Sequence, residues 1–98
     1  MSEAPEFYQI IRQKLFDAQL VSICDSYNRM KEVDMAIDWA LCRFNAKEME
    51  DDIIPLGKKN YYMWILSRLL IPGFVQVRIV FHVDEFHKKI TLIEISEE

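Results

Sequence analysis

The strongest constraint on the fold is the last quarter of the chain, where two β-branched, aromatic-rich runs flank a short polar insert. The first run alternates its side chains with period two, as a strand with two different faces does. One face would carry Val75, Val77, Ile79, Phe81 and Val83, and the other would carry Phe74, Gln76, Arg78, Val80 and His82. The polar insert at residues 84–89 predicts a turn, and the run that ends at Ser96 predicts the returning strand. The sequence therefore predicts a β-hairpin with one apolar and one polar face.

Residues 29–44 carry the clearest helical pattern of the chain. Apolar side chains recur there at helical spacing, which predicts a helix with one buried side. This stripe consists of Met30, Val33, Ile37, Ala40, Leu41 and Phe44. Asn28, just before the helix, is suited to cap it.

A second, narrow apolar row lies on the otherwise polar side of the same helix, at Met35, Trp39 and Cys42. Two explanations are open. Another part of the chain, such as residues 47–55, covers the row, or the row is an exposed strip that contacts a partner. In the second case these three residues form the predicted partner-binding site.

The segment from residue 7 to about residue 25 also shows helical spacing, but its apolar stripe changes phase partway. Ile10 falls on one side of such a helix, whereas Phe16 and Leu20 fall on nearly the opposite side. The pattern predicts a first helix that is either buried on two sides or bent near Leu15.

Three shorter segments separate the second helix from the hairpin. Residues 45–52 are acidic and predict a loop. Residues 53–57 predict a short edge strand or a turn, because Pro55 cannot donate to a central ladder. Residues 60–71 are rich in aromatic and branched side chains and compete between strand and helix. The strand is favoured because Pro72-Gly73 would turn the chain into the hairpin.

Together these elements predict an α+β fold, with two N-terminal helices packed on one face of a small, mainly antiparallel sheet of three to four strands. The chain has 98 residues, of which 51% are hydrophobic. This length and composition predict one domain over residues 1–98.

The acidic balance of the chain argues against nucleic acid as a partner. The formal net charge is −4, whereas proteins that grip RNA or DNA carry a basic surplus or a basic face. The N-terminus does not resemble a signal peptide, and no apolar run has the length of a membrane span, so a cytoplasmic location is expected. Cys24 and Cys42 lack a CxxC spacing and are expected to be free thiols.

The sequence lacks motifs for metal binding, phosphate binding or nucleophilic catalysis, so no metal or cofactor is predicted. The candidate catalytic residues are instead mostly cationic. Arg68 and Arg78 would project from neighbouring strands if the strand before the hairpin pairs with it. With Gln76 and His82 nearby, they would suit a phosphate or a carboxylate. The alternative is that each arginine forms a structural ion pair with a local acid such as Glu94.

The order Val-Arg-Ile-Val-Phe at residues 77–81 is preceded by Tyr61-Tyr62 and followed by a β-branched strand at residues 91–95. This pattern resembles the RelE/ParE toxin superfamily over roughly residues 30–96. The resemblance implies two helices against a small antiparallel sheet and an antitoxin segment that wraps the toxin. In the mRNA-cleaving branch it implies basic residues on the sheet and a basic or aromatic cluster after the last strand. Arg78 corresponds to the recurrent strand arginine of the superfamily.

The chain departs from this pattern at three places. The strand that would carry lysines reads Tyr-Tyr-Met-Trp-Ile at residues 61–65, and the segment after the last strand reads Ser96-Glu97-Glu98 where a Gly-Lys-Arg-like ending is implied. The chain is also expected to start with a helix, where the superfamily often starts with a strand. Because cutting RNA needs several positioned acid, base or cationic groups, these departures predict a toxin-like protein without ribonuclease activity.

Three functions are open at this point. The first is a toxin-like component of a toxin–antitoxin pair that acts by binding a protein. The second is a ribosome-dependent mRNA endoribonuclease with Arg78, His82 and Arg68 as catalytic residues, together with Lys58 and Lys59. The third is a non-catalytic homo-oligomeric domain in which the apolar row of the second helix is the dimer contact. The expected partner is accordingly an antitoxin-like protein or a second copy, and nucleic acid is expected only through the ribosome.

Overall fold

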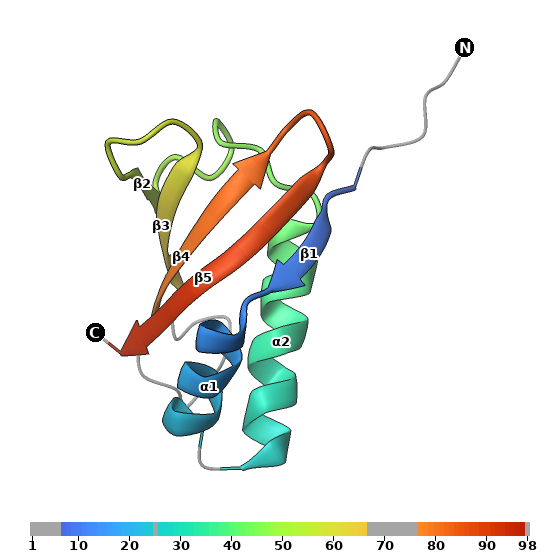
Figure 1. Cartoon of the computed structure of the whole chain (residues 1–98), viewed down its shortest axis with the longest axis vertical. Coiled ribbons are helices and arrows are strands. Elements are labelled where there is room, and N and C mark those ends of the chain that lie inside the picture. The colour runs from blue at the N-terminus through green and yellow to red at the C-terminus, as the bar shows by residue number, and fades with distance from the viewer. Residues whose placement is uncertain (1–6, 25, 67–76, 98) are drawn as a thin grey trace.

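The computed structural model of the chain describes residues 7–24, 26–66 and 77–97 (Figure 1). Its helices and strands follow one another in the order β1 (Gln9–Arg12), α1 (Lys14–Ile23), α2 (Tyr27–Leu41), β2 (Ile53–Pro55), β3 (Tyr61–Leu66), β4 (Val77–Asp84) and β5 (Lys89–Glu97). The five strands form one sheet in the order β1-β5-β4-β3-β2. β1 runs parallel to β5, and every other neighbouring pair is antiparallel. The architecture is the predicted α+β class, with more strands than the three to four expected.

The predicted hairpin is β4 and β5, and its two faces are as expected. Along β4 buried and half-buried side chains alternate, and Val77, Ile79, Phe81 and Val83 are buried. On β5 the pairing shifts by one residue, because Val80 pairs with Glu94 whereas Phe81 pairs with Leu92. Ile93 is therefore an extra residue, a β-bulge that turns Ile95 instead of Glu94 toward the core.

The turn of this hairpin is closed by Asp84. Its carboxylate accepts a hydrogen bond from the backbone N–H of His87 at 3.0 Å and lies 2.8 Å from the Nδ1 atom of the same residue. Lys88 completes the turn with a left-handed backbone (φ 53°). The hydrogen bond from the His87 N–H is the largest cause of the lowered pKa of Asp84.

The lowered pKa of Asp84 gives the hairpin a pH dependence of known sign. An acid with a lowered folded-state pKa stabilises the fold above its ordinary pKa, and this contribution is lost as the pH falls through the folded-state pKa. We therefore expect Asp84→Asn to lower stability slightly at neutral pH, where the carboxylate contributes, and to reduce the further loss of stability below about pH 4. Urea unfolding at stepwise lower pH, with Asp84→Ala for comparison, measures this. An acid dependence equal to that of the wild type would contradict the assignment.

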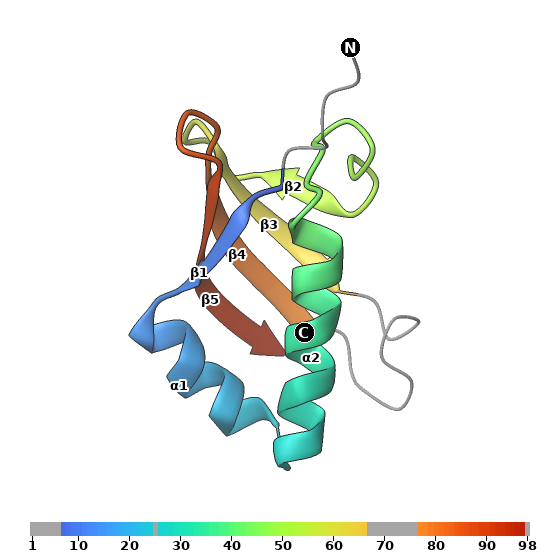
Figure 2. The same cartoon turned by 90° about the vertical axis from the view of Figure 1, so that its right-hand side faces the viewer.

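The core lies between the sheet and the two helices. α1 contributes Phe16 and Leu20, and α2 contributes the predicted stripe through Val33, Ile37 and Leu41, all of them buried. Figure 2 shows α2 running alongside the sheet and α1 beneath the end of β5. Neither helix in the described part of the chain is both long and apolar enough to cross a membrane.

The start of α2 differs from the sequence-based expectation. The N-cap is Ser26 instead of Asn28, and its side chain accepts the backbone N–H of Arg29 at 3.2 Å. The helix also ends at Leu41, before the predicted end at residue 44, although Phe44 still packs into the core. Neither Cys24 nor Cys42 takes part in a disulfide among the described residues.

The expectation of a single helix from residue 7 to about residue 25 is wrong. Residues 9–12 form β1, and α1 begins only at Lys14. The backbone N–H of Gln9 donates to the Lys88 carbonyl at 2.9 Å, and that of Gln13 donates to the Leu92 carbonyl at 3.2 Å. The phase change in the apolar pattern is therefore the boundary between a strand and a helix. It follows that the chain has an N-terminal strand, which the superfamily often has and which the sequence pattern did not predict.

The segments between α2 and the hairpin agree with the prediction where they are described. Residues 45–52 form turns, and β2 is a three-residue edge strand that ends at Pro55. β3 confirms a strand over residues 61–66, and it pairs antiparallel with β4. The remainder of the predicted strand, the expected turn at Pro72-Gly73 and the start of the hairpin at residues 74–76 lie outside the described residues.

Candidate functional site

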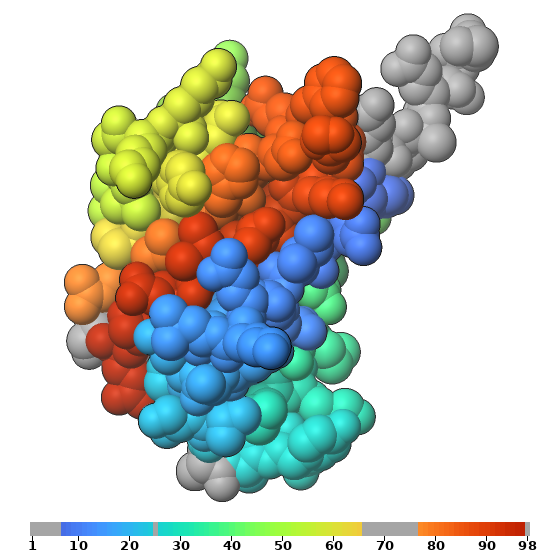
Figure 3. Space-filling view, in the orientation of Figure 1, coloured from blue at the N-terminus to red at the C-terminus, as the bar shows by residue number. Residues whose placement is uncertain are grey.

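One face of the sheet is turned away from α1 and α2, and we call it the helix-free face. Strand register and alternation place the following described residues on its main part: Ile11, Ile54, Tyr61, Met63, Ile65, Arg78, Val80, His82, Thr91, Ile93, Glu94 and Ser96. Figure 3 views the molecule from this side, where β3, β4 and β5 form the surface above α1. The predicted candidate residues Arg78 and His82 both lie here.

The helix-free face is apolar in its centre and polar on both sides of the centre. Ile54, Met63 and Val80 form one row across β2, β3 and β4. Arg78 lies in the neighbouring row toward the end of β5, opposite Ser96. His82 lies in the row on the other side, toward the hairpin turn, opposite Tyr61 and Thr91.

Arg78 is half-buried and has no counter-ion among the described residues. Its Nε atom is inaccessible to solvent and has no hydrogen-bond acceptor there. The alternative that Arg78 is tied up in an ion pair with Glu94 is wrong for the described part of the chain, because Glu94 pairs in the row of Val80 and no such bridge forms. Among the described residues the Arg78 guanidinium therefore has no ion-pair partner.

Arg12, in contrast to Arg78, forms structural ion pairs within the fold. From β1 it reaches α2, with Nη2 at 3.1 Å from Asp34 and 3.7 Å from Asp38. Burial raises the pKa of Asp34, and the nearby Arg12 partly opposes that rise. This ion pair holds β1 to α2, whereas Arg78 has no such structural task among the described residues.

His82 packs against Tyr61, with ring centroids 4.6 Å apart and planes tilted by 48°. Lys58 lies at the same end of the face, 6.0 Å from the Tyr61 ring centroid, and Lys59 is exposed in the same loop. Arg78 and His82 are four residues apart on one strand, which places their Cα atoms about 13 Å apart. They share a face, as predicted, but they flank the apolar row from opposite sides.

The remaining members of the predicted cationic cluster, Arg68 and Gln76, lie outside the described residues. The described part of the cluster is thus one arginine and one histidine.

The second candidate surface is the α2 strip, defined as Met35, Trp39 and Cys42. Met35 is 70% exposed and Trp39 is 74% exposed, whereas Cys42 is half-buried and its Sγ lies 3.7 Å from the Trp39 carbonyl. Among the described residues nothing covers the two large side chains, so the explanation that residues 47–55 cover them is wrong. The strip lies on the side of α2 opposite Val33 and Ile37.

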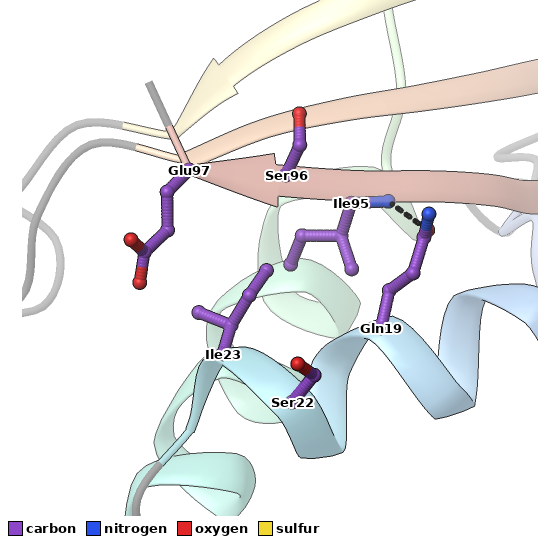
Figure 4. Close-up of a pocket in the computed structure, with 6 residues that line it drawn as sticks. All are labelled: Gln19, Ser22, Ile23, Ile95, Ser96 and Glu97. Carbon is purple, nitrogen blue, oxygen red and sulfur yellow. Dashed lines mark hydrogen bonds between the residues drawn. The ribbon is translucent and has the colours of Figure 1, made fainter.

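A pocket of about 360 Å³ between α1 and the end of β5 was not anticipated from the sequence. Gln19, Ser22 and Ile23 line it from α1, and Ile95, Ser96 and Glu97 line it from β5 (Figure 4). Gln19 Oε1 accepts the Ile95 N–H at 3.0 Å, which caps the edge of β5 beyond the reach of β1. No sequence pattern marks Gln19 for this role, because the contact joins residues far apart in the chain.

Two helices on one face of a mixed sheet, with a central antiparallel hairpin, form a RelE-like α+β fold. A chain in the crystal structure of the RelBE2 toxin–antitoxin complex from Mycobacterium tuberculosis superimposes with a TM-score of 0.61 and 8% sequence identity. The match covers 94% of this chain and 99% of that chain. At the level of sequence, no family model and no curated protein matches the chain. The structural comparison confirms the predicted RelE/ParE-like fold. Because the sequence identity is only 8%, the comparison supports the fold alone.

Proposed function

We propose that the protein is a toxin-like component of a toxin–antitoxin pair, which acts by binding another protein and has no ribonuclease activity. The RelE-like fold supports the toxin-like class, since the structurally similar chain comes from a toxin–antitoxin complex. The observation that carries the proposal is the exposure of Trp39 (74%) and Met35 (70%) on α2.

Trp39 and Met35 place two large, exposed apolar side chains next to each other on α2, which is uncommon on a protein surface. Tryptophan is enriched among the residues that dominate binding energy at protein interfaces, and methionine adapts to irregular partner surfaces. Exposed charged residues of both signs, Lys31 and Glu32 among them, flank the α2 strip. An apolar centre with a charged rim is the usual composition of a protein–protein contact.

The helix-free face supports a protein-binding role over RNA cleavage. RNA cleavage needs an activated 2′-hydroxyl, stabilised phosphate charge and a protonated leaving group. In the described part of this face, Arg78 and His82 stand on either side of an apolar row, and Glu94 adds negative charge. On β3 this face carries Tyr61, Met63 and Ile65, so β3 adds no cation that could assist a phosphate.

Co-expression with the product of the neighbouring gene tests the proposed function. A short adjacent reading frame is expected to give a stable complex with this chain, and induction of the chain alone is expected to slow growth. A chain that forms no such complex, is harmless when induced and self-associates through α2 would instead be a homo-oligomeric domain.

Purified protein added to translating ribosomes and mRNA is expected to give no cleavage above background. Losing even one charge-stabilising donor typically lowers a rate by a factor of about 100 or more, and this face holds few donors. Arg78→Ala should therefore leave the RNA pattern unchanged. Robust cleavage that Arg78→Ala abolishes would establish the endoribonuclease alternative, with Arg78 contacting phosphate and His82 transferring the proton.

A further inference from the structure

The α2 strip carries two of the sulfur atoms of the described residues, those of Met35 and Cys42. The Met35 side chain is 70% exposed. The other described side chains that contain sulfur are half-buried or buried, namely Met30, Met49, Met63, Cys24 and Cys42. Sulfur side chains are oxidised more readily the more exposed they are. An oxidant that meets the folded chain therefore reaches Met35 before the other sulfur atoms of the described residues.

Cys42 is less accessible to an oxidant than its neighbour on the α2 strip. It is half-buried, and its Sγ atom lies 3.7 Å from the Trp39 carbonyl, against the backbone of its own helix. A thiol also reacts as its thiolate, whereas the thioether of Met35 has no proton to lose. The reactivity of Met35 therefore depends on its exposure and not on the charges around it.

We propose that Met35 is a site of reversible oxidation, at which hydrogen peroxide converts the free chain into a form that binds its protein partner weakly. A lone pair of the Met35 sulfur attacks one peroxide oxygen, and the O–O bond breaks. The proton of the transferred hydroxyl passes to the departing hydroxide, so an S=O bond forms and water leaves. The sulfur is oxidised and the peroxide is reduced. The inference rests on the proposed function, since it takes the α2 strip as the partner-binding surface.

The sulfoxide places a polar group in the apolar centre of the α2 strip. Met35 and Trp39 are four residues apart on one helix and therefore lie side by side on its surface. A partner that covers Trp39 would also bury the S=O oxygen, and burial of a polar group without a hydrogen bond is unfavourable. The same partner shields Met35 in the complex. Oxidation thus acts on the free chain and prevents its association until a reductase restores the thioether.

Graded treatment of the complete chain with hydrogen peroxide, followed by peptide mass spectrometry, tests the site. Met35 is expected to gain one oxygen before Met49 and Met63. Association is then measured with the co-expressed neighbouring gene product and by sedimentation of the chain alone, and it should weaken about tenfold or more as Met35 sulfoxide accumulates. Methionine sulfoxide reductase with dithiothreitol should restore association. Dithiothreitol alone, which reduces disulfides and sulfenic acids, should not restore it.

Three variants, each compared with its own untreated form, assign the peroxide response to one sulfur atom. Met35→Leu keeps an apolar side chain without sulfur, so peroxide should leave its association unchanged. Met63→Leu, on the helix-free face, is the matched control and should respond as the wild type does. Cys42→Ala should also lose affinity on treatment by the same factor.

Two kinds of failure are distinguishable. The inference alone is overturned if the untreated chain associates and the Met35 sulfoxide form associates equally well, if another residue is oxidised first, or if Met35→Leu still responds to peroxide. A response that disappears in Cys42→Ala overturns it as well. If the untreated chain neither binds the neighbouring gene product nor self-associates, the proposed function fails, and the inference fails with it.

Discussion

Phe81→Ala is expected to lower the free energy of unfolding by about 3–5 kcal/mol, a large share of the roughly 5–15 kcal/mol typical of a domain. Phe81 is fully buried at the centre of β4. Its ring lies 5.5 Å from that of Phe44 and 5.7 Å from that of Tyr62, measured between centroids. The substitution therefore removes transfer free energy, leaves a cavity and breaks an aromatic cluster that joins the loop after α2 to the sheet.

Phe86→Ala offers a control with identical chemistry, because Phe86 lies in the β4–β5 turn and is 89% exposed. Its effect on stability is expected to stay within about 0.5 kcal/mol. Urea unfolding followed by circular dichroism measures both variants. Similar midpoints for the two would show that β4 does not face the core as described.

The hairpin and α2 could be predicted from sequence because their signals are local. On β4, alternation over a few residues is enough to separate Phe81 from Arg78. On α2, the spacing of Val33, Ile37 and Leu41 defines the buried side without knowledge of what covers it. Both patterns follow from the geometry of one element, so no distant residue has to be known.

β1 could not be predicted in the same way. It has only four residues, and its partner is β5, at the other end of the chain. The positions of Ile10 and Ile11 are therefore compatible with a helix as well as with a strand. Only the pairing of β1 with residues 89–92 of β5 shows that this segment is a strand. Strands short enough to depend on a nonlocal partner carry little pattern of their own.

On the candidate surfaces too, local features could be predicted from the sequence and features that depend on distant residues could not. Period two places Arg78 and His82 on one face, which the structure confirms. Which face carries Glu94 depends on the bulge at Ile93, which shifts the register by one residue and has no distinct sequence signal. Without the bulge Glu94 would lie opposite Ile79 on the core face, whereas with it Glu94 lies opposite Val80. Whether residues 47–55 cover the α2 strip depends on the path of a loop, which the sequence does not define. The exposure of Trp39 in the structure shows that they do not cover it.

Trp39→Ala is expected to weaken association through α2 by about 2 kcal/mol or more, roughly thirtyfold in Kd, as removal of a central interface tryptophan does. The side chain is 74% exposed, so the folded monomer loses little packing. Alanine also has the highest helix propensity, and the midpoint of unfolding should therefore stay unchanged or rise slightly. A change that lowers affinity while sparing stability separates a binding role for Trp39 from a structural one.

The affinity is measured with the co-expressed neighbouring gene product, and self-association is followed by sedimentation of the chain alone. Tyr27→Ala is the control, since Tyr27 is an equally exposed aromatic (69%) at the start of the same helix but outside the α2 strip. It should change the affinity by less than about threefold, because most interface-distant surface residues contribute little. If Trp39→Ala and Tyr27→Ala leave both kinds of association equally intact, the α2 strip is an exposed surface without a partner, and the proposed function loses the observation that carries it.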